Sequence, residues 1–299
     1  MTITSPLLTR WKRRLPGFLM SAPAVVLFLA IFVIPMGLAF VLSLTNWNGY
    51  SLNFDFLGLK NYETAFKNPR SIDGAIFTVV IALIGTLLCN ALGLVIAALV
   101  QGSGAMNATA RMIFFFPHVI SALIIGFLWS ALLAPQGVVN NLLEQTGIPE
   151  LPFLTDPALA KATIIFTVVW SAFGVNMILY IAGLKSIPAE LYEAATVDGA
   201  GRWSQFRSIT LPMLAPVVTV NLVLSLVGLL RVYDVVVALT DGGPAGSTQT
   251  IVYQILSDSF QNQKLGFGAA QSVILFLVTA VLGIAITLSR RNAEKKVSE

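Results

Sequence analysis

An arginine and an aspartate lie three residues apart within one of the most apolar stretches of the sequence, at Arg231 and Asp234. Residues at this spacing share one face of an α-helix. A charged side chain in the bilayer interior is costly, so such residues normally face each other or a polar cavity. The pair therefore has two interpretations: a mutually neutralising pair near the outer end of a helix, or part of the lining of a route for a polar solute.

Further polar residues are compatible with a solute route. Asn221 lies earlier in the same apolar stretch and Asn176 lies in the stretch before it. Guanidinium, carboxylate and amide groups can hydrogen-bond the hydroxyls of a polyol, and a tyrosine ring can stack on the apolar face of a sugar. The predicted pathway residues are Asn176, Tyr180, Asn221, Arg231, Tyr233 and Asp234.

The sequence lacks the residue patterns of most catalytic and metal sites. It contains no GxxxxGK[ST] loop for nucleotide phosphates and no GxSxG or paired-carboxylate signature. His118 is the only histidine and Cys89 the only cysteine, which leaves no cluster for a metal. We therefore expect no enzymatic activity and no cofactor in this chain. His118 itself is predicted to be a neutral side chain bonded to a neighbouring helix, with a role in the solute route as the alternative.

Composition identifies the class of protein that must position these residues. The 299 residues are 56% apolar and 11% charged, with a mean hydropathy of +0.83. So few charges cannot cover a water-soluble surface, and a single cysteine excludes a disulfide-stapled domain. The pI near 9.3 reflects short basic clusters beside apolar runs, which is typical of membrane topology and not of nucleic-acid binding. We predict an all-α protein that crosses a lipid bilayer several times.

Six apolar runs are long enough to span the ~30 Å hydrocarbon core as helices, each with about 20 residues or more. The first is too long for a cleaved signal peptide, so it is predicted to be an uncleaved anchor, kinked at Pro23 and Pro35. The predicted spans are 17–44, 74–100, 111–133, 162–184, 213–240 and 267–289.

The distribution of lysine and arginine predicts the orientation of these spans. Twelve of the eighteen lie on one side, five on the other and one within a span. Cytoplasmic loops carry the excess of positive charge. Both termini are therefore predicted to be cytoplasmic, with an N-terminal tail over 1–16, a transmembrane domain over 17–290 and a C-terminal tail over 291–299.

Small residues recur at every fourth position of the second predicted span, at Gly85, Cys89, Gly93 and Ala97. This spacing lets a neighbouring helix approach closely. On this pattern alone, a neighbour in the same chain and a neighbour in another subunit are both open.

The longest cytoplasmic loop, 185–212, predicts a short helix of about eleven residues, ~16 Å long. Pro188 suits its first turn, acidic residues suit its positive N-terminal end, and Gly199 or Gly201 ends it. Its small apolar side comprises Leu191, Ala194, Ala195 and Val197. Such a helix can fit a groove on another protein. A membrane-surface helix is the alternative, but the acidic residues match an anionic surface poorly.

This loop resembles a known motif. Glu193-Ala194-Ala195, then Gly199, then Ile209-x-Leu211-Pro212 resembles the EAA–G–I-LP loop of binding-protein-dependent ABC importer permeases, spacing included. Nearly all of 17–290 is similar to the carbohydrate branch of that family, which includes the maltose and glycerol-3-phosphate permeases, without a large extracytoplasmic insertion. The other matching segments are Phe56–Tyr62, Arg111–Pro117, Gly137–Asn140 and Thr240–Pro244, the last with Asp241 where a glycine is more usual.

The resemblance implies a six-helix type I ABC importer (MetI-like) permease fold whose loop helix sits in a cleft of a cytoplasmic ATPase. ATP and magnesium would then be bound by that ATPase. The implied coupling residues are Glu190, Glu193, Ala194, Ala195, Asp198, Gly199, Arg202 and Arg207.

The resemblance also implies partners and a location. These are a second similar permease in a heterodimer, two copies of the ATPase, an extracytoplasmic solute-binding protein, and the bacterial or archaeal cytoplasmic membrane. The chain would form half of an alternating-access pathway for a sugar or related polyol. The turn containing Gly242, Gly243 and Pro244 is predicted to end a helix, with an outer gate or partner contact as the alternative.

The rival function is a self-sufficient secondary transporter or channel for a small polar solute. It predicts coupling carboxylates in several spans, whereas Asp234 is the one carboxylate available within them. The sequence leaves open which sugar or polyol is carried.

Overall fold

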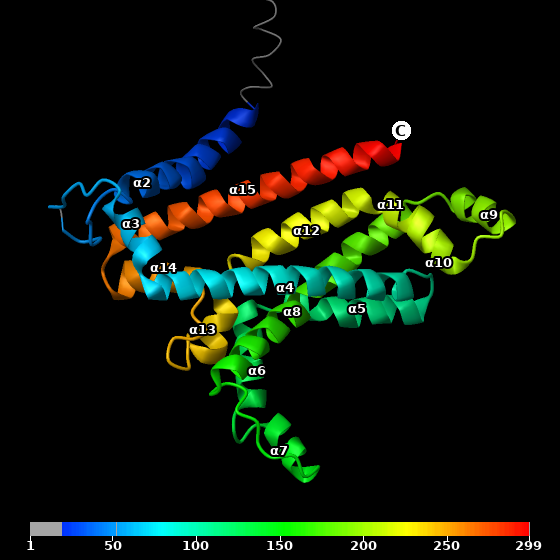
Figure 1. The fold of residues 1–299 in the computed structure, drawn as a ribbon, viewed down its shortest axis with the longest axis horizontal. Coiled ribbons are helices and arrows are strands. Elements are labelled where there is room, and N and C mark those ends of the chain that lie inside the picture. Colours follow the sequence, from blue (N-terminus) through cyan, green and yellow to red (C-terminus); the bar gives the residue numbers. More distant parts are fainter. Residues whose placement is uncertain (1–19, 52, 299) are drawn as a thin grey trace, which may run out of the picture.

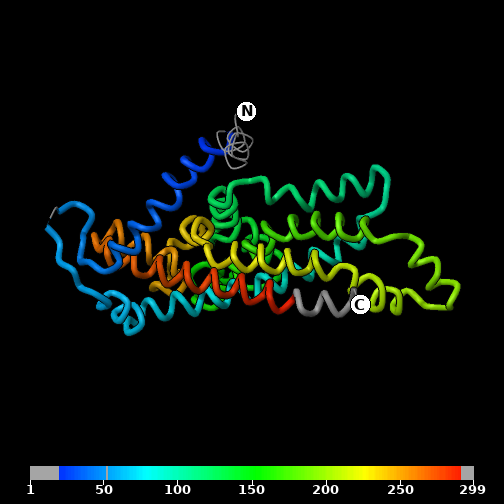
Figure 2. Tube along the Cα trace, turned by 90° about the horizontal axis from the view of Figure 1, so that it is seen from above, coloured from blue at the N-terminus to red at the C-terminus, as the bar shows by residue number. Residues whose placement is uncertain are grey.

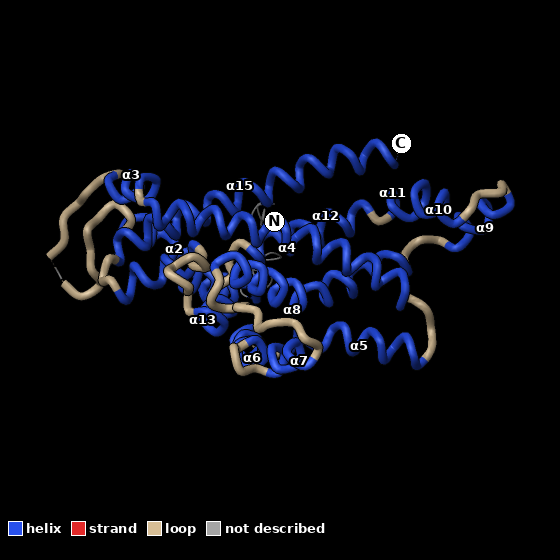
Figure 3. The backbone as a smooth tube through the Cα atoms, turned by 60° about the horizontal axis from the view of Figure 1, so that its bottom comes forward, coloured by secondary structure: helices blue, strands red, loops and turns tan. Residues whose placement is uncertain are grey.

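The computed structural model describes the backbone of residues 20–51 and 53–298 and the side chains as far as Arg290. Throughout these residues the chain is built from helices joined by loops, with no β-strand (Figure 3). The predicted N-terminal tail and the first three residues of the first predicted span lie outside the described residues. The long helices run side by side in a bundle, with the C-terminal end of the chain and the 185–212 loop at the same end (Figure 1).

Helical segments account for each predicted span. A first helix runs from Met20 to Leu42 and includes a π-helical segment. In chain order the segments are η1 (Leu29–Val33), α2 (Ile34–Leu42), α3 (Lys60–Lys67), α4 (Pro69–Val100), α5 (Ala105–Val119), α6 (Ala122–Leu133), α7 (Val138–Gln145), α8 (Pro157–Lys185), α9 (Ala189–Val197), α10 (Arg202–Gln205), η2 (Phe206–Thr210), α11 (Leu211–Met213), α12 (Ala215–Leu229), α13 (Asp234–Thr240), α14 (Ile251–Leu256), η3 (Ser257–Gln261) and α15 (Leu265–Ser298).

Length and apolar composition identify five stretches that can cross a bilayer, or six if one bent pair counts as a single span. The five are Met20–Leu42, Pro69–Val100, Ala122–Gln145, Pro157–Lys185 and Leu265–Arg290. The bent pair joins Arg202–Met213 to Ala215–Leu229 at an angle of 65°. The number of spans equals the predicted six when the bent pair is counted as one span, and two of the predicted continuous helices are broken.

The predicted third span, 111–133, is two helices. α5 ends at Val119, Ile120 has an extended backbone with ψ 141°, and α6 begins at Ala122. Pro117, in the last turn of α5, has no N–H to donate to the preceding turn. The apolar pattern continues across the break, so hydropathy alone does not reveal it.

The predicted fifth span is also broken. α12 ends at Leu229, and α13 begins at Asp234 after Tyr233 leaves the helical conformation at φ −139°. The prediction that Arg231 and Asp234 share one face of a continuous helix is therefore wrong. The break leaves the Val232 carbonyl without a helical partner, and the Thr250 hydroxyl donates to it at 2.8 Å. Because Thr250 is eighteen residues away, no local sequence signal marks this stop.

π-Helical segments precede two prolines. The Leu211 N–H, immediately before Pro212, donates to the carbonyl of Phe206, five residues back. The Ile34 N–H, immediately before Pro35, makes the same kind of bond to Leu29. A proline cannot donate a hydrogen bond and crowds the preceding turn, which widens the helix locally. At Pro35 the sequence predicts a kink, and the structure has this π-helical segment just before the proline.

The small-residue stripe of α4 packs within the chain. At Gly93, a Cβ atom would lie 2.7 Å from the Asn176 Cβ and 3.0 Å from the Met177 backbone nitrogen, so α4 and α8 meet almost backbone to backbone. At Gly85, a Cβ atom would lie 2.8 Å from Leu229 of α12. Cys89 and Ala97 have no exposed surface. The neighbours of this stripe are therefore helices of the same chain.

Polar residues in the family-like segments close the ends of helices. The Asn61 amide donates to the carbonyls of Ser43 at 2.9 Å and Thr45 at 2.7 Å, just beyond α2. The Arg111 guanidinium donates to the carbonyl of Val100, the last residue of α4, at 2.6 Å. Carbonyls at helix ends lack helical partners and carry partial negative charge, so both contacts stabilise the ends of spans.

Replacing Gly93 with alanine tests the close approach of α4 and α8. The added methyl group has no room, and overpacking of this kind costs about 1–3 kcal/mol. The melting temperature of the purified protein, followed by tryptophan fluorescence, should fall. The matched control is Gly37→Ala, where nothing lies within 4 Å of the new atom. Equal melting temperatures for both variants would contradict this packing.

Candidate functional site

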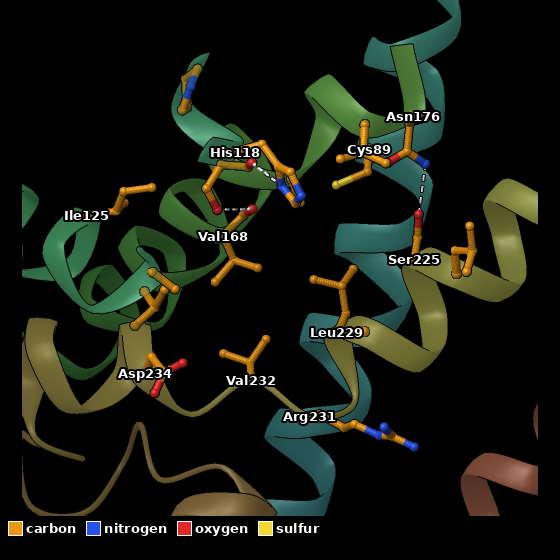
Figure 4. A pocket seen from close by; sticks show the side chains of 18 of the residues that line it. Cys89, His118, Ile125, Val168, Asn176, Ser225, Leu229, Arg231, Val232 and Asp234 are labelled. Atoms are coloured by element: carbon orange, nitrogen blue, oxygen red, sulfur yellow. Dashed lines mark hydrogen bonds between the residues drawn. The ribbon is translucent and has the colours of Figure 1, made fainter. Parts of the chain in front are cut away.

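A cavity of about 480 Å³ lies between α6, α8 and α12, beside both helix breaks (Figure 4). Five of the six predicted pathway residues line it, together with His118, which the sequence offered as a possible addition. The five are Asn176, Asn221, Arg231, Tyr233 and Asp234. Residues of the third, fourth and fifth predicted spans therefore line one cavity.

Tyr180 is the predicted pathway residue that does not line the cavity. Its side chain is 1% exposed. Its hydroxyl donates to the Asn90 side-chain oxygen at 2.7 Å, which joins α8 to α4. In this structure the ring does not line the cavity and Tyr180 joins α8 to α4, so its place in the pathway stays a prediction.

Two asparagines supply amide groups to the cavity wall. The Asn176 side chain donates to the Ser225 hydroxyl at 2.8 Å, between α8 and α12 (Figure 4). Asn221, one turn before Ser225 on α12, is almost fully buried, and neither atom of its amide has a hydrogen-bond partner among the described residues. The nearby Tyr180 hydroxyl gives its proton to Asn90. Asn221 therefore lines the cavity with an amide that has no hydrogen-bond partner among the described residues.

His118 contacts a neighbouring helix and also lines the cavity. Its Nδ1 lies 3.2 Å from the carbonyl oxygen of Ser171 in α8 (Figure 4). A carbonyl only accepts, so Nδ1 carries the proton in this contact. The predicted bond to a neighbouring helix is confirmed. The same position leaves the ring available to a solute in the cavity.

Arg231 and Asp234 point in different directions (Figure 4). No ion pair joins them among the described residues, so the interpretation as a mutually neutralising pair is wrong. Asp234 is exposed at the first turn of α13 and lines the cavity. Arg231 borders a second space as well, a groove of about 420 Å³ between α12 and α15.

The second candidate site is α9, which stands out at the end of the bundle (Figure 1). It has nine residues, fewer than predicted, and none is buried. The implied coupling acids Glu190 and Glu193 are both exposed. Because none of its residues is buried, α9 adds little to the packing of the chain. Its surface is therefore available to another protein.

Two residues that the sequence analysis did not select hold α9 in place. The Tyr192 and Thr210 hydroxyl oxygens are 2.9 Å apart. The Gln205 amide donates to the Thr196 hydroxyl at 3.0 Å and to the Ala200 carbonyl at 3.1 Å. Both contacts lead from α9 to the α10–η2 segment that continues into α12. The sequence contains no periodic signal for them, because the two side chains of each contact lie on different helical segments.

Gly199 ends α9 as predicted. Its φ of +77° is left-handed, a conformation that side chains with a Cβ rarely adopt. The Gly199 N–H donates to the backbone carbonyl of Thr196 at 3.1 Å, and the Ala200 N–H donates to the backbone carbonyl of Ala195 at 2.8 Å. This pair of bonds is the Schellman arrangement, which satisfies carbonyls at the helix end.

The outer turn also ends a helix as predicted. Asp241 is the left-handed C-cap of α13, and Gly242 follows with φ +77°. The Thr240 and Thr248 hydroxyls are 2.8 Å apart, and the Tyr253 hydroxyl donates to both the backbone and the carboxylate of Asp241. Burial, followed by the contact with Asp241, raises the pKa of Tyr253. The turn is thus held against α14, and its role as a gate or partner contact stays a prediction.

No group of three or more histidine, cysteine, aspartate or glutamate side chains that could hold a metal occurs within residues 20–51 and 53–290. The chemistry available in the cavity is hydrogen bonding by amide, imidazole, hydroxyl and carboxylate groups. That set suits a hydroxyl-rich solute.

Comparison with known sequences gives consistent matches. Residues 89–299 match the model of the family described as "Binding-protein-dependent transport system inner membrane component". The chain is 32% identical to a probable starch degradation products permease of Thermoanaerobacterium thermosulfurigenes, over 89% of this chain and 91% of the relative. It is 33% identical to a lactose permease of Rhizobium radiobacter, again over 89% and 91%. A diacetylchitobiose permease of Streptomyces coelicolor is 32% identical, over 88% of this chain and 80% of the relative.

Solved structures agree with these matches. The fold is similar to a chain of a bacterial ABC transporter involved in alginate import, with a TM-score of 0.82, 25% identity and coverage of 99% of this chain and 100% of that one. A second structure, of an alginate transporter in complex with an alginate-bound periplasmic protein, gives a TM-score of 0.85 at 26% identity, covering 97% and 99%.

Replacing Gly199 with alanine should loosen α9. A left-handed residue with a Cβ costs about 1–2 kcal/mol, which corresponds to roughly 5- to 30-fold more frequent opening. Cleavage after Glu190 and Glu193 by a glutamate-specific protease should accelerate accordingly. Gly201→Ala is the matched control, since Gly201 has φ −69° and open space around it. Unchanged cleavage of the Gly199 variant would mean that the glycine does not maintain the helix end.

Proposed function

Because the chain belongs to the family of binding-protein-dependent transport system inner membrane components, we propose that it lines half of a sugar pathway and engages a separate ATPase through α9. It is a multi-pass permease subunit of an ABC importer. The proposal concerns the solute, the partners and the residues that perform each role.

The observation that carries the proposal is a continuous connection from α9 to the cavity wall. Tyr192 and Gln205 tie α9 to the segment that becomes α11 and α12. α12 then supplies Asn221 and Ser225 to the cavity. A displacement of α9 by an ATPase would therefore be transmitted to a helix that contacts the solute. Such a linkage would let a separate ATPase act on the solute cavity of a chain whose own sequence has no nucleotide-binding loop.

The groups that line the cavity suit a hydroxyl-rich solute. Asn221 lines the cavity with an amide that has no partner among the described residues, and His118 and Asp234 add further hydrogen-bonding groups. Adjacent hydroxyls of a sugar can satisfy a donor and an acceptor together. The names of the relatives, which refer to starch products, lactose and diacetylchitobiose, favour a saccharide over other polar solutes.

The proposed assembly contains a second homologous permease, two copies of an ABC ATPase and an extracytoplasmic solute-binding protein, in a bacterial or archaeal cytoplasmic membrane. One of the similar alginate transporters is in complex with an alginate-bound periplasmic protein, which supports the last partner. ATP and magnesium would be held by the ATPase, so this chain would contribute no catalytic group. The implied coupling surface remains the exposed face of α9 with Arg202 and Arg207 beyond it.

The rival proposal, a self-sufficient secondary transporter, is less well supported. Asp234 is the carboxylate that lines the cavity. An ion-coupled carrier normally places several ionisable or ion-binding groups at its transport site. The exposed α9 would also have no role in such a carrier.

Reversing the charge of Glu193 tests the coupling role of α9. Glu193→Lys should release the ATPase from the purified complex or uncouple ATP hydrolysis from uptake, because charge mismatch at a contact costs several kcal/mol. Uptake of radiolabelled sugar should fall at least about tenfold. Glu144→Lys, an equivalent change at an exposed acid of α7, serves as the control. A complex that keeps its ATPase and full coupled uptake after Glu193→Lys would favour the rival.

Removing the Asn221 amide tests the solute site. Asn221→Leu keeps the branched shape of the side chain and loses both hydrogen-bonding atoms, worth about 1–3 kcal/mol, so uptake should fall roughly 5- to 150-fold while the ATPase stays bound. Asn141→Leu, on the exposed face of α7, should leave uptake unchanged. Normal uptake by the Asn221 variant would remove this residue from the pathway.

A further inference from the structure

We propose that the cavity beside the two helix breaks selects against acidic saccharides and favours those that carry a protonated amine, with Asp234 as the selecting charge and His118 as a second acceptor. This inference rests on the proposed sugar pathway and narrows its substrate class. It concerns the half of the pathway that this chain contributes.

Asp234 is the charged side chain that this part of the chain presents to the cavity. Two charged residues border the cavity, Arg231 and Asp234, and no lysine does. The Arg231 guanidinium points away from it, on the side of the groove between α12 and α15 (Figure 4). The Asp234 carboxylate is exposed and forms no ion pair among the described residues. An anion in the cavity would therefore meet an uncompensated negative charge, whereas a cation would find its counter-ion there.

The helix ends at the first break leave this balance unchanged. The C-terminal end of α5 at Ile120 and the N-terminal end of α6 at Ala122 border the cavity together. Such ends carry opposite partial charges of about half an elementary charge each. Because the two ends are adjacent in the chain, their effects oppose each other, and the full charge of Asp234 sets the sign.

Two donors beside the cavity are already used within the protein. The protonated Nδ1 of His118 donates to the Ser171 carbonyl at 3.2 Å, and the Ser171 hydroxyl donates to the Val168 carbonyl at 2.9 Å. A neutral imidazole with its proton on Nδ1 offers Nε2 as an acceptor. The His118 ring points into the cavity (Figure 4). A solute there is thus offered two acceptors, this nitrogen and the carboxylate of Asp234.

An ammonium group matches these acceptors. It has three N–H donors and a positive charge, and hydrogen bonds between ionised groups are about twice as strong as those between neutral groups. A carboxylate or phosphate on the solute can only accept, so it can bond neither acceptor and is repelled by Asp234. A hydroxyl both donates and accepts, so we expect neutral saccharides to bind with intermediate strength.

The remaining wall suits the ring of a saccharide. Val168, Leu229 and Val232 lie between the polar groups (Figure 4), and the C–H faces of a sugar ring can pack against such side chains. The volume of about 480 Å³ is within the range of small-molecule sites, roughly 300–1,000 Å³. The combination fits an amino saccharide better than a bare ammonium ion.

Three matched disaccharides test the proposal: a disaccharide of glucosamine, the neutral cellobiose and the acidic cellobiouronic acid. The whole membrane complex is placed in nanodiscs without the solute-binding protein, because that protein would impose a selection of its own. Dissociation constants follow from the rise in melting temperature with ligand concentration. We expect the amine to bind at least about tenfold more tightly than cellobiose, and the acid at least about tenfold more weakly.

Substitutions of Asp234 assign this selection to its charge. Asp234→Asn should bring the three dissociation constants within about threefold of one another, because the charge is lost. Asp234→Glu should keep their order, because the charge remains. Asp73→Asn, at an exposed aspartate of α4 that does not line the cavity, is the matched control and should also keep the order. Melting temperatures without ligand show whether each variant is folded. An order that survives Asp234→Asn would overturn the proposal.

His118→Asn separates the second acceptor from the charge. Asparagine can keep a donor for the Ser171 carbonyl, but Nε2 is lost, so binding of cellobiose should weaken roughly 2- to 10-fold. Unchanged binding would remove His118 from the proposal. Equal binding of all three disaccharides by the wild type would overturn the selection and leave the sugar pathway intact. Binding of none of them, together with no uptake of any saccharide, would instead overturn the proposed function itself.

Discussion

Inside a bilayer, every backbone N–H and C=O group must find a partner within the protein, and the architecture of this chain follows from that constraint. Its spans are interrupted at Ile120 and between Leu229 and Asp234. At the second interruption the freed Val232 carbonyl accepts a bond from Thr250, a residue of the outer loop. At this break the irregular backbone is thus covered by another element of the same chain, and both breaks border the cavity.

The sequence predicts the elements well and the breaks poorly. The number of apolar spans, the exposed helix ending at Gly199 and the close packing around Gly93 all follow from composition and local spacing. The breaks do not, because apolar residues continue through them and the bonds that stabilise them join distant segments. The error at Arg231 and Asp234 has this origin, since a three-residue spacing defines a shared face only while the helix continues. The bond between Tyr180 and Asn90 could not be predicted either, because the two residues lie on different helices and are ninety positions apart.

α12 connects the functional parts of the chain. One face, with Asn221 and Ser225, borders the cavity, and another, with Val223 and Val227, borders the groove toward α15. Its inner end continues from the segment that holds α9. α4 and α8 provide the contrasting rigid part, because contact at Gly93 and the bond between Tyr180 and Asn90 fix their relative position. If an ATPase displaces α9 as proposed, α12 would carry the displacement toward the cavity, while the α4–α8 pair would keep its arrangement.

The burial of Cys89 has a practical consequence for watching that movement. It is the one cysteine of the chain, and its side chain has no exposed surface. Thiol reagents require access to the sulfur. The native thiol is therefore shielded from such reagents in this structure. Spin labels or fluorophores can therefore be attached to cysteines introduced in pairs, one on the α4–α8 unit and one on α9 or α12, without first replacing Cys89. Such pairs would report distances between these elements.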